Sequence, residues 1–314
     1  MTGTLERRRG DGGGAERRRA AAQDYRVRAV RDRRVLEAAL SEDRAVAAYA
    51  LGHLEWDLFE TATFYLGEGP GGSAVVMHAT GMGQTTVTVG APQAVGAILS
   101  IHPGAQRSYL STATPDQLEA LRRTHHVTDE LRMRRMLVTG EAFAPVPAEV
   151  RRLTGRDVSS LNALYATEGG PSFYRASTID QAVYFGSFDG TRLVSVAGSH
   201  VVAPNVSIAV VGNVFTAIEY RGCGLATRTT SAVTEALLAR GCREVVLTVD
   251  PSNTPAVRAY RRLGYVAGSD VVEARLRRRD LLGLGPLLRR RAARRRGRYE
   301  EPAGVEIVPR GSRG

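Results

Sequence analysis

The hydrophobic positions in the first half of the chain follow helical and strand-like spacings in a regular order. Apolar residues recur at helical spacing from Val35 to Tyr49, and β-branched runs separated by Gly-rich turns follow. The predicted order is helix, three strands, helix, strand, helix and strand. These elements are expected at 35–49, 58–66, 74–79, 85–89, 92–99, 108–110, 115–123 and 133–138.

The second half shows the same order of patterns. Its elements are expected at 159–166, 182–188, 192–202, 206–216, 227–240, 244–249 and 250–262, followed by a strand pair from Tyr265 to about Leu276. The Asp189-Gly190 dipeptide is a strong hairpin signal, and Gly241 is typical of a helix end. The shared order predicts a duplicated architecture.

Changes in composition divide the chain into four parts. Residues 1–34 are rich in Arg and Gly and are predicted to be a disordered tail. A Pro-Val-Pro segment at 145–147 separates a first domain, 35–146, from a second domain, 147–278. Residues 279–314 are predicted to be an Arg-rich, solvated tail that begins with a Leu-rich patch of one or two helical turns.

The formal charge of +11 is concentrated at the two ends of the chain. Residues 1–34 carry +6 and residues 275–314 carry +9, whereas residues 35–274 carry −4. The charge therefore indicates contact with nucleic acid or an acidic membrane only through the tails. All 43 basic residues are Arg, which excludes lysine chemistry such as a Schiff base or a phosphate-loop lysine.

The cysteine and histidine positions do not indicate a metal site or a disulfide framework. Cys223 and Cys242 are the two cysteines, and they lack metal-ligand spacing. His102 and the His125-His126 pair have no acidic or cysteine partner at ligand spacing. The sequence also lacks a signal-peptide pattern and any run of about 18 apolar residues. We expect no metal, no membrane span and a reducing, cytoplasmic setting.

The segment from Tyr220 to Thr227 has the composition of an anion-binding turn. It reads Tyr-Arg-Gly-Cys-Gly-Leu-Ala-Thr and stands between a β-branched run and a helical run. Small residues allow the backbone to approach an anion, and the free N–H groups and dipole of a helix N-terminus attract it. The pattern predicts that this turn binds a phosphate-bearing cofactor.

Three motifs of the second half resemble those of the GNAT superfamily of acyl-CoA-dependent N-acyltransferases. Residues 221–226 match the family's Arg/Gln-x-x-Gly-x-Gly/Ala turn, the strand at 212–216 precedes it, and 253–265 resembles the family's Asn…Ala…Tyr…Leu-Gly-Phe/Tyr helix. The resemblance covers about 150–275 and extends to a tandem layout with a degenerate GNAT-like first half, as in the glycine N-acyltransferase group. It implies a mixed α/β fold, with a twisted, mostly antiparallel sheet flanked by helices in each half.

The resemblance implies transfer of an acetyl group from acetyl-CoA, or of another acyl group, to a primary amine by direct attack in a ternary complex. The backbone of Val214, Phe215 and Thr216 is expected to pair with the pantetheine arm. Asn253 is expected to hydrogen-bond the cofactor arm or the splayed strand, to cap its helix, or both. The residues expected at the pyrophosphate are Arg221, which adds charge or braces the turn, and Gly222, Cys223, Gly224, Leu225, Ala226 and Thr227.

The resemblance also implies a proton donor, whereas it leaves the proton acceptor open. Tyr260 is expected to protonate the departing thiolate, with ordinary core packing as the alternative. The strand at 207–213 lacks the carboxylate that many family members carry there. The candidates for the base are His200, Asp250, Glu219 and a water relay. Covalent catalysis by Cys223 is disfavoured because a phosphate turn directs its backbone, not its side chains, at the ligand.

The first half lacks the turn motif. Its segment 90–96 contains Pro92, which removes an N–H, so we expect no phosphate site there. This half is expected to shape the acceptor site or to brace the second half. Two other classes of function remain open, namely a non-catalytic acyl-CoA sensor and association with RNA through the tails. The acceptor amine, the acyl length and the oligomeric state are not predicted.

Overall fold

The computed structural model describes residues 24–80, 83–147, 149–170, 173–280 and 283–300. The first half contains β1 (Arg26–Val30), α2 (Arg33–Leu40), α3 (Arg44–Gly52), α4 (Trp56–Phe59), β2 (Ala62–Gly69), β3 (Gly72–Ala79), β4 (Thr85–Gly90), α5 (Pro92–Ile101), β5 (Arg107–Thr112), α6 (Leu118–Thr124) and β6 (His125–Thr139). The second half contains β7 (Arg151–Arg152), α7 (Val158–Ala166), α8 (Ala176–Gln181), β8 (Tyr184–Asp189), β9 (Arg192–Ala203), β10 (Ile208–Thr216), α9 (Leu225–Ala239), β11 (Glu244–Val249), α10 (Thr254–Arg262) and β12 (Val266–Arg278). Helix α11 (Leu284–Arg295) and β13 (Tyr299–Glu300) follow.

The two halves repeat one architecture. In each, helices precede a meander of three antiparallel strands, which continues through helix, strand, helix and a long last strand. The third meander strand pairs in parallel with the next strand in both halves, β4 with β5 and β10 with β11. The predicted fold class, a mixed and mostly antiparallel sheet flanked by helices in two tandem halves, is confirmed.

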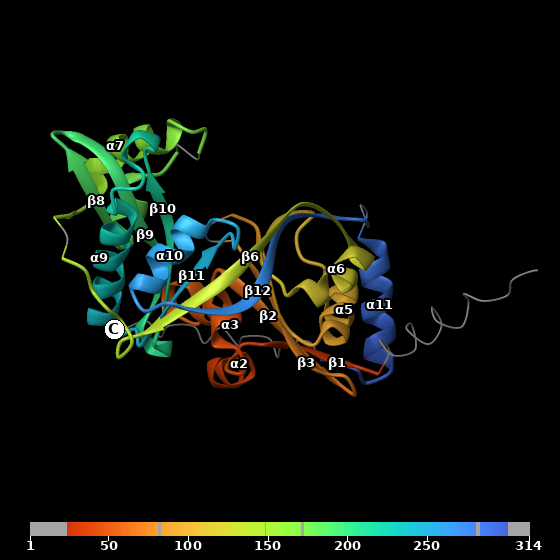
Figure 1. Ribbon diagram of the computed structural model, residues 1–314. Coiled ribbons are helices and arrows are strands. Elements are labelled where there is room, and N and C mark those ends of the chain that lie inside the picture. The colour runs from red at the N-terminus through yellow and green to blue at the C-terminus, as the bar shows by residue number, and fades with distance from the viewer. Residues whose placement is uncertain (1–23, 81–82, 148, 171–172, 281–282, 301–314) are drawn as a thin grey trace, which may run out of the picture.

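The last strands of the two halves are exchanged between their sheets. Residues 134–139 of β6 pair with β11 of the second half, and residues 274–277 of β12 pair with β5 of the first half. The described strands consequently form one 13-stranded sheet in the order β13-β1-β2-β3-β4-β5-β12-β6-β11-β10-β9-β8-β7. Figure 1 shows β6 and β12 crossing from one lobe to the other. The strand pair expected from Tyr265 is wrong, because β12 continues without a turn across both lobes.

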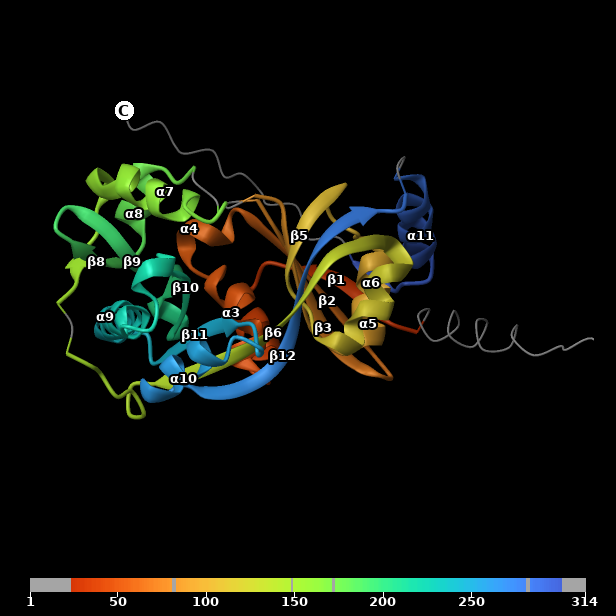
Figure 2. The same cartoon turned by 45° about the horizontal axis from the view of Figure 1, so that its top comes forward.

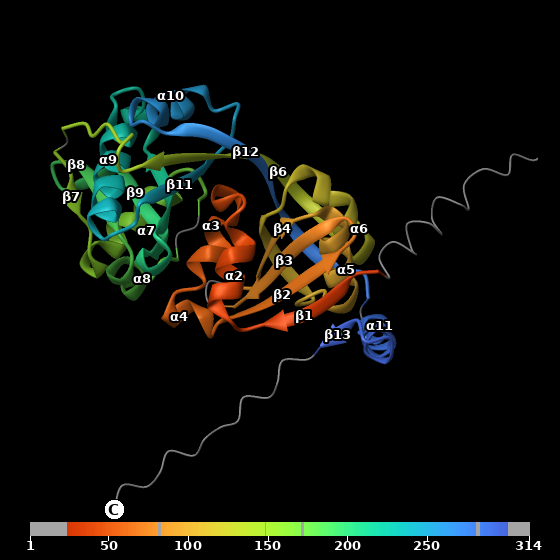
Figure 3. The ribbon, with the colours of Figure 1, turned by 90° about the horizontal axis from the view of Figure 1, so that it is seen from below.

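Helix α3 of the first half packs on the sheet of the second half. Figure 3 shows α3 between the two lobes. A single core cluster contains α3 residues such as Leu51 together with Val201 of β9 and Val210 of β10. Gly52 approaches so closely that a Cβ atom there would lie 2.3 Å from Cγ1 of Val201. The first half therefore covers part of the face of the sheet from which the site described below opens.

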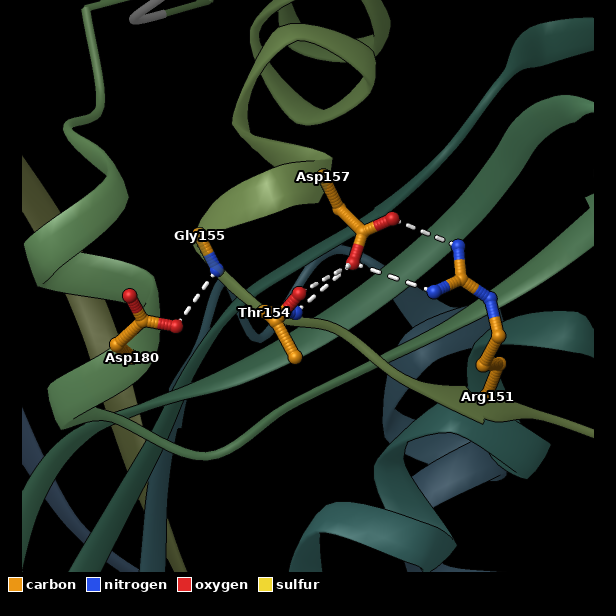
Figure 4. A network of polar contacts seen from close by, with 5 residues as sticks. All are labelled: Arg151, Thr154, Gly155, Asp157 and Asp180. Atoms are coloured by element: carbon orange, nitrogen blue, oxygen red, sulfur yellow. Dashed lines mark hydrogen bonds and ion pairs between the residues drawn. The ribbon is translucent and has the colours of Figure 1, made fainter.

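Helix α7 packs on β8 and β9 in a separate core cluster, and its start is held by a network of polar contacts (Figure 4). The Asp157 carboxylate accepts from the Thr154 N–H at 2.8 Å and from the Arg151 guanidinium at 2.7 Å. Asp180 of α8 accepts from the Gly155 N–H at 2.7 Å. Because these bonds satisfy N–H groups at the start of the helical segment, they fix the direction in which α7 crosses the sheet.

The ends of the chain differ from the predicted tails wherever the structure describes them. Strand β1 and the start of α2 lie within the predicted tail 1–34, and α11 and β13 lie within 279–314. Helix α11 lies beside α5 (Figure 2), where Arg289 and Arg290 donate to the carbonyls of Ser100 and Ile101. The segment expected as a tail is therefore a helix whose Arg289 and Arg290 bond the last carbonyls of α5, while Arg291 and Arg294 to Arg296 are exposed as predicted. Residues 1–23 and 301–314 lie outside the described residues.

Candidate functional site

Strands β10 and β11 separate halfway along their length. Their parallel pairing runs from Ile208 to Val211 and ends there. On its other side, β10 is irregular between Gly212 and Phe215 and then pairs again with β9. Residues 212–216 consequently present one backbone edge without a partner strand among the described residues. Such an edge can bind an extended ligand by adding it as a strand.

Asn213 holds the bulge that opens this edge. It has a φ of 55°, a left-handed conformation that Asn tolerates better than most residues. Its backbone carbonyl accepts from the Tyr165 hydroxyl at 2.7 Å, and its Oδ1 accepts from the Tyr174 hydroxyl at 3.0 Å. Its Nδ2 donates to the Tyr184 hydroxyl at 2.7 Å. Sequence reasoning missed all four residues, although an Asn after Gly in a strand is a signal for a bulge.

His200 of β9 lies against the bulge and is bonded to the first half of the chain. A Cβ atom at Gly212 would lie 2.3 Å from Cε1 of His200, so the ring occupies the space that a side chain would need. The Tyr49 hydroxyl of α3 lies 2.7 Å from Nδ1 of His200. Burial lowers the pKa of His200, and a hydrogen bond with Asn213 opposes this shift. The imidazole is therefore neutral at physiological pH.

A buried arginine stands behind Tyr49. Arg135 of β6 is fully buried, and its guanidinium carbon lies 5.0 Å from the centre of the Tyr49 ring. It donates to Thr112 Oγ1 at 2.6 Å and also to Thr248 of β11. Arg135 therefore connects strands of both halves at the point where the two sheets meet.

The turn before α9 has the geometry of an anion site. Gly222 and Gly224 have φ values of 80° and 77°, and no atom lies within 4 Å of the position of an added Cβ. The Gly224 N-cap provides no side-chain bond, so the first N–H groups of α9 have no side-chain cap. Arg221 donates to the Thr216 carbonyl at 3.1 Å and pairs with Glu168. It braces the turn, which is one of its two expected roles.

Tyr260 lies on α10 beside the opening between the strands. It belongs to the same packed cluster as Val211, Leu247 and Val214, which flank the point of separation. Burial raises its pKa to about 12, so its hydroxyl remains protonated at neutral pH. No hydrogen bond joins this hydroxyl to another side chain or carbonyl of the described residues. The group is therefore a protonated donor next to the unpaired edge.

Comparison with known proteins gives the family of the second half. Residues 157–265 match the model of the acetyltransferase (GNAT) family. The second half carries a GNAT acetyltransferase domain. No curated protein sequence matches the chain.

Solved structures with related folds include GNAT proteins. A Drosophila protein is 16% identical, with a TM-score of 0.53 over 78% of this chain and 87% of its own, a likeness of fold alone. A putative GNAT acetyltransferase from Novosphingobium aromaticivorans is 26% identical over 62% of this chain and 84% of its own, with a TM-score of 0.47. A tandem GNAT protein from the clavulanic acid biosynthesis pathway is 13% identical over 80% of this chain and 98% of its own, with a TM-score of 0.47.

The remaining predicted residues of the GNAT domain lie in turns. Asn253 caps α10, because its side chain accepts from the Ala256 N–H at 3.2 Å. Asp250 accepts from the N–H and the hydroxyl of Ser252, and these bonds lower the pKa of its carboxyl. Glu219 pairs with Arg192 at 2.5 Å, and hydrogen bonds lower its pKa as well. Both carboxylates are exposed and weakly basic, and the structure does not bring them together with His200.

The equivalent turn of the first half is filled by the protein itself. Gly90 has a φ of 100°, and a Cβ atom there would lie 2.4 Å from the Ser73 carbonyl oxygen. The Gly90 carbonyl accepts from the Gln117 amide at 2.7 Å, and Pro92 occupies the first turn of α5. This packing leaves less room for a phosphate than the open glycines of the GNAT domain provide.

Within the described residues, no group of three or more potential metal ligands occurs, and no helix is long and apolar enough to span a membrane.

Proposed function

We propose that the chain is an acyl-CoA-dependent N-acyltransferase that transfers an acetyl group from acetyl-CoA to a primary amine. The observation that carries the proposal is the convergence of an unpaired strand edge at 212–216 with an uncapped helix N-terminus at 224–227. The edge offers backbone groups to the amides of a pantetheine arm, and the helix offers N–H groups to a pyrophosphate. The residues present therefore fit the family's cofactor.

Residues on both sides of the opening would hold the cofactor. Val214, Phe215 and Thr216 supply the strand edge, and the open glycine turn that begins at Gly222 supplies the anion site. Cys223 is exposed and contributes its backbone N–H; its thiol has no catalytic role here. Asn253 caps α10, and this cap sets the direction of the helix that carries Tyr260. Both cysteines are free thiols, which suits the reducing cytoplasm.

The chemistry requires one donor at the leaving group and one at the carbonyl oxygen. An acyl thioester supplies an activated carbonyl carbon whose C–S bond breaks as the amine forms its C–N bond. Tyr260 donates its phenolic proton to the departing sulfur, and its raised pKa keeps the hydroxyl protonated until the thiolate forms beside it. A free N–H of β10 near Val214 stabilises the negative charge that develops on oxygen.

The proton of the amine passes to water, from which the Tyr260 phenolate regains its proton, and His200 is a positioning residue. Arg135 interacts with the Tyr49 hydroxyl and can only donate, so the Tyr49 O–H is free to donate to Nδ1 of His200. Neutral His200 then carries its proton on Nε2 and bonds Asn213. In this arrangement His200 has no free lone pair to act as a base, and it supports the bulge. The other two candidates named from the sequence, Asp250 and Glu219, are weak bases in exposed turns.

The proposal is tested by thiol release from acetyl-CoA in the presence of a panel of primary amines, together with calorimetric titration of CoA. We expect saturable CoA binding and amine-dependent thiol release. Absence of CoA binding would refute the proposal.

A second candidate function, a non-catalytic acyl-CoA sensor, is favoured by the lack of a basic carboxylate at the opening. Tight CoA binding without turnover on any amine, and with no effect of Tyr260→Phe, would support the sensor instead.

A further inference from the structure

A cavity of about 370 Å³ lies in the first half, between its sheet and α11. It is lined by residues of β2, β3, the end of α5, the end of β12 and α11, among them Tyr65, His78, His102, Arg278, Pro286 and Arg290. We call it the α11 pocket. Its volume falls within the range of about 300–1,000 Å³ that is usual for sites of small molecules. Figure 2 shows α11 at the end of the molecule remote from α9, so this cavity is separate from the opening in the GNAT domain.

Three side chains of the α11 pocket have nitrogen atoms that are buried and lack a hydrogen-bond partner. These atoms are Nε2 of His102, Nε of Arg278 and Nε of Arg290. His102 is only 5% exposed, and its ring stacks on Tyr65 with 3.9 Å between the ring centres. Unsatisfied buried polar groups are costly, and these three belong to side chains that line one cavity.

The protonation of His102 makes the unpartnered atom a donor. Arg290 donates to Nδ1 of His102 at 3.2 Å, which leaves Nε2 as the nitrogen that carries the proton in the neutral ring. Burial and the neighbouring Arg290 lower the pKa of His102 to about 3, so the ring stays neutral. All three unpartnered groups are therefore N–H donors, and a ligand that satisfies them must be an acceptor.

The charge of the lining favours an anion. Arg278 and Arg290 are cationic, and no carboxylate lines the part of the cavity formed by described residues. The nearby Asp280 accepts from the N–H groups of Gly283 and Gly285 at 2.8 Å, so its charge is directed to the start of α11. His78 is neutral, because burial lowers its pKa to about 4; its Nε2 donates to the His102 carbonyl, and its Nδ1 accepts from the Thr86 hydroxyl.

We propose that the α11 pocket binds a small anionic molecule through a carboxylate or phosphate group held by Arg278, Arg290 and His102. Oxyanions of this kind accept several charge-assisted hydrogen bonds at once, which matches the three donors and two positive charges. The bound anion connects the end of β12 with α11 and the end of α5. This site is independent of acyl transfer, because none of its residues belongs to the opening between β10 and β11.

The test is calorimetric titration of the full-length protein with inorganic phosphate and, in a separate arm, with succinate, at constant ionic strength set by chloride. We expect saturable binding of at least one of the two, and the arms show whether phosphate or carboxylate is preferred. Arg278→Gln should weaken this binding about tenfold or more, because a charge-assisted hydrogen bond is lost. Arg291→Gln is the matched control, since it removes the same charge from an exposed position of α11, and it should leave the affinity within about twofold.

Two results would overturn the proposal. One is the absence of saturable binding of either anion. The other is binding that Arg278→Gln and Arg290→Gln leave unchanged, as expected for phosphate held at the glycine turn of the GNAT domain. If Arg290→Gln detaches α11, which circular dichroism detects, Arg278→Gln alone decides. Within the described residues the Arg278 guanidinium makes only a long 3.4 Å contact with the Gly104 carbonyl, so little structure depends on it.

Discussion

The Tyr49 hydroxyl lies 2.7 Å from Nδ1 of His200 and joins two residues that are 151 positions apart in the chain. Tyr49 belongs to α3 of the first half, and His200 lies on the GNAT domain against the Gly212–Asn213 bulge. The bulge in turn opens the strand edge on which we place the cofactor. The degenerate first half therefore supports the opening directly, through one hydrogen bond, in addition to covering the face of the sheet.

We expect Tyr49→Phe to lower kcat/KM for the acyl transfer about fivefold to tenfold. The substitution keeps the ring but removes the hydrogen bond, whose net value is about 1 kcal/mol, and lets His200 and Asn213 move. The measurement is a steady-state assay with a fixed amine. Tyr25→Phe is the matched control, because its hydroxyl accepts from the Gly71 N–H far from the bulge. Equal effects of the two variants would show that the contact with His200 has no role in the site.

Tyr260→Phe tests the proton donor. We expect kcat to fall by at least about a hundredfold, since general acid catalysis contributes that much, while the affinity for CoA stays the same. Tyr265→Phe is the control, because its ring centre lies 6.1 Å from that of Tyr260 and its hydroxyl bonds Thr234. That control should affect stability rather than kcat. An unchanged kcat in Tyr260→Phe assigns Tyr260 to core packing, the alternative role.

Gly224→Val tests the anion turn. The φ of 77° costs a β-branched residue about 1–2 kcal/mol, and the side chain would stand in the open space where we place the pyrophosphate. We expect the affinity for CoA to fall at least about tenfold, measured by calorimetry. Gly169→Val is the matched control, with a φ of 70° and equally open surroundings. It should carry a similar strain and bind CoA normally; a normal affinity in Gly224→Val would argue against the turn as the pyrophosphate site.

The local features of the site were predictable from the sequence, whereas the long-range ones were not. The turn at 221–227 and the cap at Asn253 depend on neighbouring residues, so their patterns carry the information. The exchange of β6 and β12 leaves no such trace, because a strand has the same alternation of apolar residues whichever strand it pairs with. The contact of Tyr49 with His200 depends on that arrangement of the two halves, and the tyrosines around Asn213 are likewise distant in sequence.

The exchange predicts that the GNAT domain does not fold by itself. A fragment 147–278 would lack β6, so β11 would lose the partner that pairs with all six of its residues, and the α3 face would be exposed. We expect this fragment to be insoluble, and co-expression with fragment 1–146 to restore a soluble complex. Solubility and heteronuclear NMR of the two preparations decide. A soluble, fully active 147–278 fragment would contradict both the exchange and the supporting role of the first half.

Buried histidines predict that the protein loses stability in mild acid. Burial lowers the pKa of His78 to about 4 and of His102 to about 3, and it also lowers the pKa of His200, whereas unfolded histidines titrate near 6.5. Between these values the unfolded state binds more protons than the folded state, so the free energy of unfolding falls as the pH decreases below about 6.5. It should be constant with respect to these groups above that pH.

Urea denaturation at pH 7.5 and pH 5.0 measures this effect. For the unsubstituted protein we expect a lower urea midpoint at pH 5.0 than at pH 7.5. In His78→Gln the difference between these two midpoints should be smaller, because the variant lacks one of the groups that must be neutral in the fold. His126→Gln is the matched control, since its side chain is not buried. Slight desolvation and the neighbouring Arg279 and Arg277 lower its pKa, and little stability is linked to it. A midpoint that does not change between the two pH values would show that these histidines are charged in the folded protein.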